Sequence, residues 1–85
     1  IYYHRGILYQ RQQKNDPALQ DYSQAIRLNS YARAETYNNR GTLYIMEGLY
    51  QDALNDFDRA LERNPDFVPA RMNREQVMKD MMKNK

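Results

Sequence analysis

Residues Tyr37–Pro65 read YNNRGTLYIMEGLYQDALNDFDRALERNP, and this segment gives the clearest indication of how the chain folds. Its apolar residues recur at helical spacing on both sides of Gly48, which predicts two amphipathic helices joined by a tight turn. Much of the segment also occurs earlier in the chain, at an offset of 35 residues. The identical pairs are Tyr2/Tyr37, Arg5/Arg40, Gly6/Gly41, Tyr9/Tyr44, Ala18/Ala53, Asp21/Asp56, Ala25/Ala60 and Asn29/Asn64. A period of this length indicates an array of helical hairpins.

The length and composition of the chain predict one small globular domain over residues 1–85. Hydrophobic residues make up 41% and charged residues 28%, and the net charge is +2. Basic and acidic residues are interspersed, so no nucleic-acid partner is expected. No apolar run approaches the roughly 20 residues of a membrane-spanning helix, so no membrane insertion is expected.

The sequence lacks the groups from which most catalytic and metal centres are built. It has no cysteine and a single histidine, His4, so neither a zinc site nor a histidine-based catalytic constellation is expected. No glycine-rich phosphate loop, nucleophile elbow or calcium-binding loop is present. We therefore predict that the protein is not an enzyme and uses no cofactor and no metal.

Periodicity and turn residues together predict five helices. They are expected at about residues 1–14, 17–28, 34–47, 50–63 and 68–83. Asp16 is expected to cap the second helix, and Gly48 to end the third in the left-handed conformation. Sequential helices with such short connections pack as antiparallel neighbours, so the predicted fold class is all-α.

The repeated residues resemble the tetratricopeptide repeat, a helical hairpin of about 34 residues. In the second repeat the matching residues are Tyr37, Arg40, Gly41, Tyr44, Ala53, Phe57, Ala60 and Pro65. In the first repeat they are Tyr2, Arg5, Gly6, Tyr9, Ala18, Tyr22 and Ala25. The resemblance implies a right-handed α-α superhelix of antiparallel helical hairpins, with five helices in about two and a half repeats.

The repeats divide this domain into three parts. The first, about residues 1–33, has no capping residue at its start, and we expect it to be truncated at its N-terminus. The second covers about residues 34–67. Residues 68–83 are expected to form a terminal capping helix, because Glu75 and Arg71 replace the glycine and the tyrosine of the other repeats.

An arginine and an aspartate stand sixteen residues apart in both complete repeats, as Arg5 with Asp21 and Arg40 with Asp56. Residues at this spacing face each other in an antiparallel hairpin. We therefore predict a structural ion pair in each hairpin, with the guanidinium fork matching the carboxylate. The alternative is that the two arginines contact a ligand.

In this family the first helix of each repeat lines a concave surface, so the resemblance implies a peptide-binding groove. The expected groove residues are Tyr3, His4, Ile7, Gln10 and Arg11 in the first helix, Glu35, Asn38, Asn39, Thr42 and Met46 in the third, and Met72, Asn73 and Gln76 in the fifth. The amides of Asn39 and Asn73 offer donors and acceptors to a peptide backbone. For each residue the alternative is a solvated helix surface.

Co-chaperone members of the family clamp a C-terminal carboxylate with lysine, arginine and asparagine side chains. The corresponding residues here are Tyr3, Ile7, Asn39, Pro69 and Asn73. Only Asn39 agrees, and the cations that the clamp needs are absent. Binding of a chaperone C-terminal tail is therefore disfavoured.

The resemblance implies a protein–protein interaction module that binds a peptide or helical segment in its groove, as part of a larger scaffold or adaptor. The alternative is structural, namely self-association into a homo-oligomer through exposed terminal helices. Met81 and Met82 either cover the end of the fourth helix or form an adhesive surface for a partner or second copy. The sequence identifies no partner, pathway, organism or oligomeric state, and no compartment beyond the cytoplasm as a default.

Overall fold

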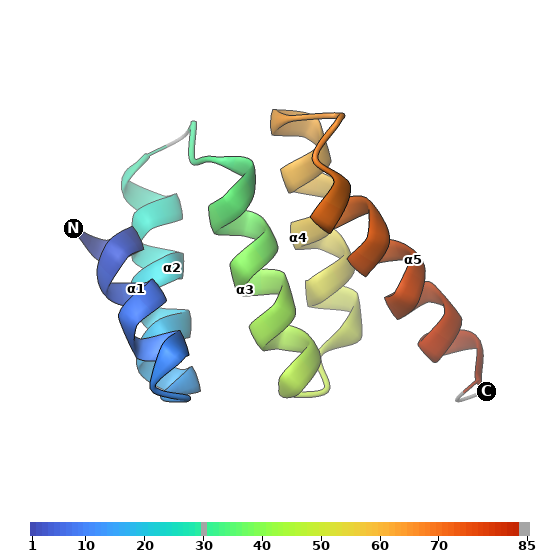
Figure 1. Ribbon diagram of the computed structural model, residues 1–85, viewed down its shortest axis with the longest axis horizontal. Helices are drawn as coiled ribbons and strands as arrows, with labels where there is room; N and C mark the ends of the chain where they lie inside the picture. Colours follow the sequence, from blue (N-terminus) through green and yellow to red (C-terminus); the bar gives the residue numbers. More distant parts are fainter. Residues whose placement is uncertain (30, 84–85) are drawn as a thin grey trace.

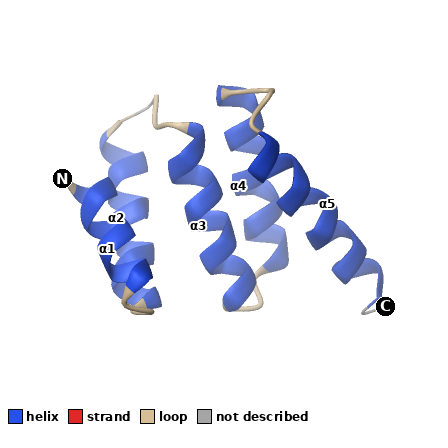
Figure 2. Ribbon diagram, viewed as in Figure 1, coloured by secondary structure: helices blue, strands red, loops and turns tan. Residues whose placement is uncertain are grey.

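The computed structural model describes residues 1–29 and 31–83, where all regular structure is helical (Figures 1 and 2). The helices are α1 (Tyr2–Arg11), α2 (Asn15–Leu28), α3 (Ala34–Met46), α4 (Tyr50–Arg63) and α5 (Val68–Lys83). α1 pairs with α2 and α3 with α4, while α5 packs mainly on α4. The predicted all-α fold with five helices is confirmed. No helix in the described part of the chain is long and apolar enough to cross a membrane.

The turns within the two hairpins have the same form although their residues differ. The chain turns at Gln13 with φ of +61° after α1, and at Gly48 with φ of +78° after α3. The closing bonds run from Lys14 N to the Tyr9 carbonyl (2.9 Å) and from Leu49 N to the Tyr44 carbonyl (2.8 Å). The left-handed residue predicted at Gly48 is confirmed. The first helix is shorter than predicted, because Gln13 adopts the same conformation and ends it.

The second helix also begins differently from the prediction. Its first residue is Asn15, so Pro17 is the third residue of the first turn, where a missing N–H leaves no helical hydrogen bond unmade. Asp16 makes no side-chain capping bond, so the predicted cap is wrong. The Asp16 carboxylate still lies in the first turn, where the helix dipole favours negative charge.

Each hairpin closes around an aromatic ring that packs on a glycine. Tyr22 of α2 and Phe57 of α4 are completely buried. A Cβ atom on Gly6 would lie 2.8 Å from the Tyr22 ring, and one on Gly41 would lie 2.6 Å from the Phe57 ring. Neither position has room for a side chain, so glycine permits the close approach of the two helices in each hairpin.

The core extends along the array because each hairpin also packs on the helix that follows it. Leu43 of α3 is buried in a cluster with Ala18 and Tyr22 of α2. Val77 of α5 is buried in a second cluster, which includes Phe57 of α4. Each repeat therefore completes the core of its predecessor, as in other helical repeat arrays.

Candidate peptide-binding surface

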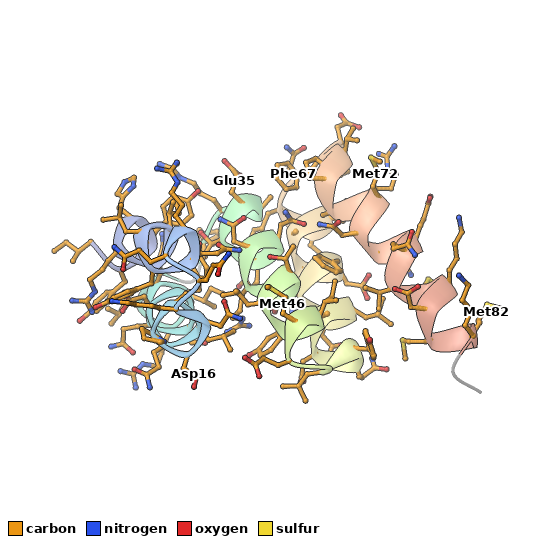
Figure 3. The ribbon with its side chains drawn as sticks, turned by 60° about the horizontal axis from the view of Figure 1, so that its bottom comes forward. Asp16, Glu35, Met46, Phe67, Met72 and Met82 are labelled. Carbon is orange, nitrogen blue, oxygen red and sulfur yellow. The ribbon has the colours of Figure 1, made fainter. Side chains whose placement is uncertain are left out.

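Helices α1, α3 and α5 form one face of the array, in front of α2 and α4 in the view of Figure 1. Figure 3 shows Glu35 of α3 and Met72 of α5 projecting on the same side of the molecule, with Asp16 of α2 on the opposite side. This is the face on which the sequence places the groove. We call it the α1–α3–α5 face.

The predicted groove residues differ widely in their exposure. The exposed ones are His4, Arg11, Met46, Met72 and Gln76. The partly buried ones are Tyr3, Ile7, Gln10, Glu35, Asn39, Thr42 and Asn73, while Asn38 is buried. Met46 and Met72 are the large apolar side chains of this set that face solvent, with 66% and 63% of their surface exposed.

Several amide and hydroxyl groups of this face bond to one another. Nε2 of Gln10 donates to Oγ1 of Thr42 (3.3 Å), and this bond links α1 to α3. The side-chain oxygen of Gln10, Oε1, accepts from the Tyr22 hydroxyl. Asn73 donates to Oδ1 of Asn38 (3.0 Å), which links α5 to α3. These bonds hold the three helices at fixed spacing. The amides of Asn38 and Asn73, which the sequence offers as ligand contacts, therefore already have partners within the fold.

The Tyr22 hydroxyl is the buried end of this network. Burial raises the pKa of Tyr22 to about 12, because a buried phenolate would lose its hydration. A hydrogen bond with Asn39 opposes the increase. The hydroxyl therefore keeps its proton at neutral pH and donates a hydrogen bond to Oε1 of Gln10 (2.5 Å). Asn39 accordingly supports the core through this bond.

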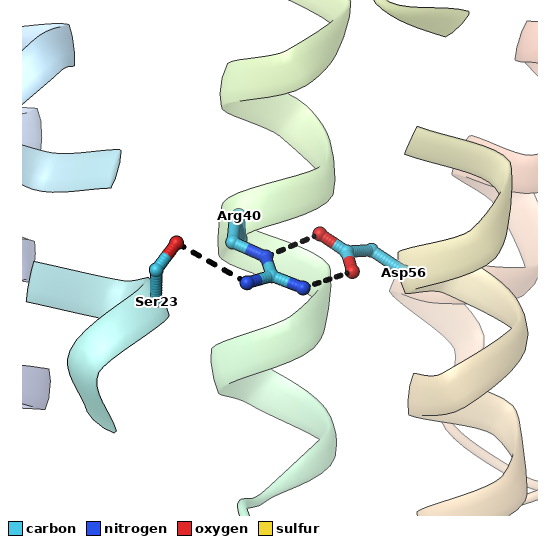
Figure 4. A network of polar contacts seen from close by, with 3 residues as sticks. All are labelled: Ser23, Arg40 and Asp56. Atoms are coloured by element: carbon cyan, nitrogen blue, oxygen red, sulfur yellow. Dashed lines mark hydrogen bonds and ion pairs between the residues drawn. The ribbon is translucent and has the colours of Figure 1, made fainter. Parts of the chain in front are cut away.

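Arg40 lies between α2 and α4 rather than among the exposed residues of the face (Figure 4). Its Nε and Nη2 each donate to an oxygen of Asp56 at 2.8 Å, and its Nη1 donates to Oγ of Ser23 at 3.2 Å. The exposed fractions of the Arg40 and Asp56 side chains are 18% and 4%. Burial raises the pKa of Asp56, although the bonds from Arg40 oppose this.

The ion pair of the first hairpin has the same two-pronged geometry in a more open setting. Arg5 donates from Nε and Nη2 to Asp21 at 2.7 and 2.8 Å. The Arg5 side chain is 52% exposed. Its hydrogen bonds hold the pKa of Asp21 below the usual range. Both predicted pairs thus form, and both arginines are occupied by carboxylates of their own hairpins.

Sequence reasoning missed a third pair, between Arg74 of α5 and Asp58 of α4. Nε of Arg74 donates to Oδ1 of Asp58 at 2.7 Å, and both side chains are about half exposed. A sign of this pair was present in the repeat, because Asp58 stands 35 residues after Ser23 and is therefore its counterpart. Ser23 and Asp58 each accept from the arginine of the next helix.

The exposed side chains of the α1–α3–α5 face are mostly uncharged. Its exposed groups are methionine, amide, imidazole and guanidinium side chains, spread over three helices. Within residues 1–29 and 31–83, no group of three or more histidine, cysteine, aspartate or glutamate residues is placed to hold a metal ion.

The sequence model of the family described as tetratricopeptide repeat matches residues 1–31 and 34–67. Similar curated proteins include the photosystem I assembly protein Ycf3 from a strain of Prochlorococcus marinus and that from a strain of Synechococcus, each 34% identical over 67 residues. The aligned region covers 76% of this chain but only 39% of each relative. Among solved structures, the crystal structure of MamA has the same fold, with a TM-score of 0.89 at 21% identity. That match covers 94% of this chain and 46% of the MamA chain.

Proposed function

Because this chain belongs to the tetratricopeptide repeat family, we propose that it is a protein–protein interaction module that binds a peptide or helical segment along its α1–α3–α5 face. The module would serve as an adaptor within a larger assembly. The names of its relatives, which are called photosystem I assembly proteins, support an adaptor role. The chain spans 39% of the length of those relatives.

The main support for this surface is its pair of solvent-facing methionines. Met46 on α3 and Met72 on α5 are unbranched, polarisable side chains that adapt to apolar ligand groups. Burying two such residues contributes substantially to affinity, at about 1.5–3 kcal/mol for each side chain that becomes fully buried. The guanidinium of Arg40, the cation of α3, is already hydrogen-bonded to Asp56 and Ser23. The two methionines therefore favour a ligand with apolar anchors.

The test is a comparison of two methionine variants of equal chemistry. Peptides selected from a random library against the parent chain would be measured for affinity with Met46→Ala/Met72→Ala and with Met82→Ala. Met82 is 73% exposed but lies near the end of α5, away from the proposed contacts. We expect at least a tenfold loss of affinity in the double variant and none in the control. Unchanged affinity in the double variant, with its melting temperature retained, would contradict the proposal.

A second candidate function is self-association through the terminal helices. A hollow of about 210 Å³ between α4 and α5 is lined by Leu54, Met78, Met81 and Met82. Met81 packs partly on the core, which favours the covering role for that residue, whereas Met82 faces solvent. Light scattering at rising concentration tests this candidate. A dimer that Met82→Asp dissociates would support it, and a monomer at every concentration would exclude it.

A further inference from the structure

A polar hollow lies between the start of α1, the end of α2 and the start of α3. Its volume is about 160 Å³, and its walls include Tyr3, His4, Ala32, Arg33 and Thr36. Since one water molecule takes up about 30 Å³ of the liquid, the hollow has room for a group of several heavy atoms. Tyr3 and His4 are also predicted residues of the α1–α3–α5 face, so the hollow adjoins that face. We call it the α1–α3 hollow.

The hydroxyl of Thr36 is the buried polar group of this hollow. Only 3% of the surface of Thr36 is exposed. Among residues 1–29 and 31–83, its hydroxyl has no hydrogen-bond partner. No fully enclosed side-chain oxygen or nitrogen of these residues lacks a partner, so the Thr36 hydroxyl keeps access to the hollow. It can therefore donate to, or accept from, a group that enters there.

The cation of the hollow is Arg33, which directly precedes α3. Its guanidinium lies 5.8 Å from the centre of the Tyr3 ring, so it reaches from α3 toward α1. In the described part of the chain this guanidinium forms no ion pair and no hydrogen bond, unlike those of Arg5, Arg40 and Arg74. All of its N–H donors are therefore available to a ligand.

The first turn of α3 adds a partial positive charge at the same place. This helix has 13 residues, and its N-cap residue, Arg33, makes no capping side-chain bond. The free N–H groups at a helix start favour an anion. Glu35 is the nearest carboxylate in sequence, but it projects from the α1–α3–α5 face and is not a wall residue of the hollow. The hollow thus combines a cation, an unpaired hydroxyl and a helix start, with no carboxylate in its walls.

The next junction, between α3 and α5, has apolar side chains at the equivalent places. Phe67 stands 35 residues after Ala32 and packs on the core. Ala70 stands in place of Thr36 and has no exposed surface. The connection between α2 and α3 is also one residue longer than that between α4 and α5. The polar α1–α3 hollow is therefore a feature of this junction and not of the repeat.

We propose that the α1–α3 hollow is a subsite for an anionic side chain of the bound peptide, either a carboxylate or a phosphate. This inference rests on the proposed function and adds a polar contact to its apolar ones. Arg33 would donate two parallel hydrogen bonds to the anion, and the Thr36 hydroxyl would donate a third. Neither residue corresponds to the clamp of the co-chaperones, which binds a C-terminal carboxylate.

The first experiment adds sodium phosphate or sodium acetate to the isotope-labelled chain at constant ionic strength. We expect the amide signals of Arg33 and Thr36 to shift and to saturate. Arg33→Gln and Thr36→Val should each weaken the binding several-fold. Arg27→Gln is the matched control and should bind as the parent does, because Arg27 is also exposed but is not a wall residue of the hollow. Tighter binding of phosphate would identify a phosphorylated side chain as the occupant, and tighter binding of acetate an aspartate or glutamate.

The variant Thr36→Val also tests whether the hydroxyl is free. Valine has nearly the same shape as threonine, so the variant should melt no lower than the parent when the hydroxyl has no partner in the fold. A clearly lower melting temperature would overturn the assignment of this hydroxyl to a ligand. Equal signal shifts at Arg27 and Arg33 would also overturn the proposal, because they would show a diffuse attraction of anions to basic side chains.

The second experiment connects the hollow to peptide binding. Peptides would be selected against the parent chain from libraries that contain glutamate and phosphoserine, and their anionic residue would then be replaced by glutamine or serine. The replacement should lower affinity for the parent several-fold and have no effect with Arg33→Gln. Selected peptides without an anionic residue, or an equal loss with both chains, would overturn the proposal. Failure of the proposed function is distinguishable, because Met46→Ala/Met72→Ala would then keep its peptide affinity while small anions still bind in the hollow.

Discussion

The two hairpins make the same contacts but differ in burial. Each has a glycine beneath an aromatic ring and an arginine bonded twice to an aspartate sixteen residues away. Arg5 is 52% exposed, whereas Arg40 is 18% exposed and also bonds to Ser23. The difference arises because α3 has a helix on both sides and α1 has one only on one side. The same pair of residues can thus contribute differently to the free energy of unfolding, depending on how far the neighbouring helices bury it.

The largest expected difference between the hairpins is the effect of removing each aspartate. Asp56→Ala leaves Arg40 with little solvent and an uncompensated charge, and should lower the free energy of unfolding by about 3–5 kcal/mol. Asp21→Ala should cost clearly less, because water can solvate Arg5. Urea denaturation of both variants measures the difference, with Asp58→Ala as an exposed control. Equal losses in the two hairpins would show that burial does not set the strength of the pair.

Replacement of the packed glycines should have the next largest effect. Gly41→Ala places a methyl group 2.6 Å from a ring that has no exposed surface, and should cost about 1–3 kcal/mol through overpacking. Gly6→Ala should cost somewhat less, since its contact with Tyr22 is 2.8 Å. Thermal unfolding of the two variants would measure this. A Gly41→Ala variant as stable as the parent would mean that α3 and α4 can separate without loss.

The two aspartates should also respond differently to pH. Arg5 lowers the pKa of Asp21, so the stability from Asp21 is present above the usual value of 3.8 and is lost as the pH falls through its lower folded-state pKa. Burial raises the pKa of Asp56 against the opposing bonds from Arg40, so Asp56 should take up its proton at a higher pH than Asp21. Carbon-detected titration of the two carboxyl groups should place Asp21 below 3.8 and Asp56 above it. The reverse order would contradict the assigned difference in burial.

The smallest expected effect lies in the turns. Gln13 and Gly48 both have positive φ, but only glycine adopts this conformation without strain. Gln13→Gly should therefore raise the free energy of unfolding by up to about 1 kcal/mol, as the strain is removed. Gln12→Gly, at φ of −83°, is the matched control and should not stabilise the chain. A Gln13→Gly variant that melts below the parent would show that the turn carries no such strain.

Much of the fold could be predicted from the sequence because its determinants are regular. Helical periodicity with Gly48 and Pro65 as breakers predicts the bounds of the third and fourth helices closely, and the offset of 35 residues predicts which helices are equivalent. The Arg–Asp spacing predicts two ion pairs because an antiparallel hairpin has one register. Gln13 was not predictable in this way, since glutamine has no intrinsic preference for positive φ and the closing of the hairpin imposes it.

The candidate site was less predictable than the fold. From the sequence, the resemblance to the repeat family predicted which residues would lie on the α1–α3–α5 face, because helical spacing sets which side chains share a face. Only the tertiary structure decided what those residues do there. It joined Asn73 to Asn38 and Gln10 to Thr42, and it placed Arg40 between a carboxylate and a hydroxyl. Spacing along one helix fixes direction, whereas hydrogen bonding and burial depend on the distance to neighbouring helices, which only the packed array sets.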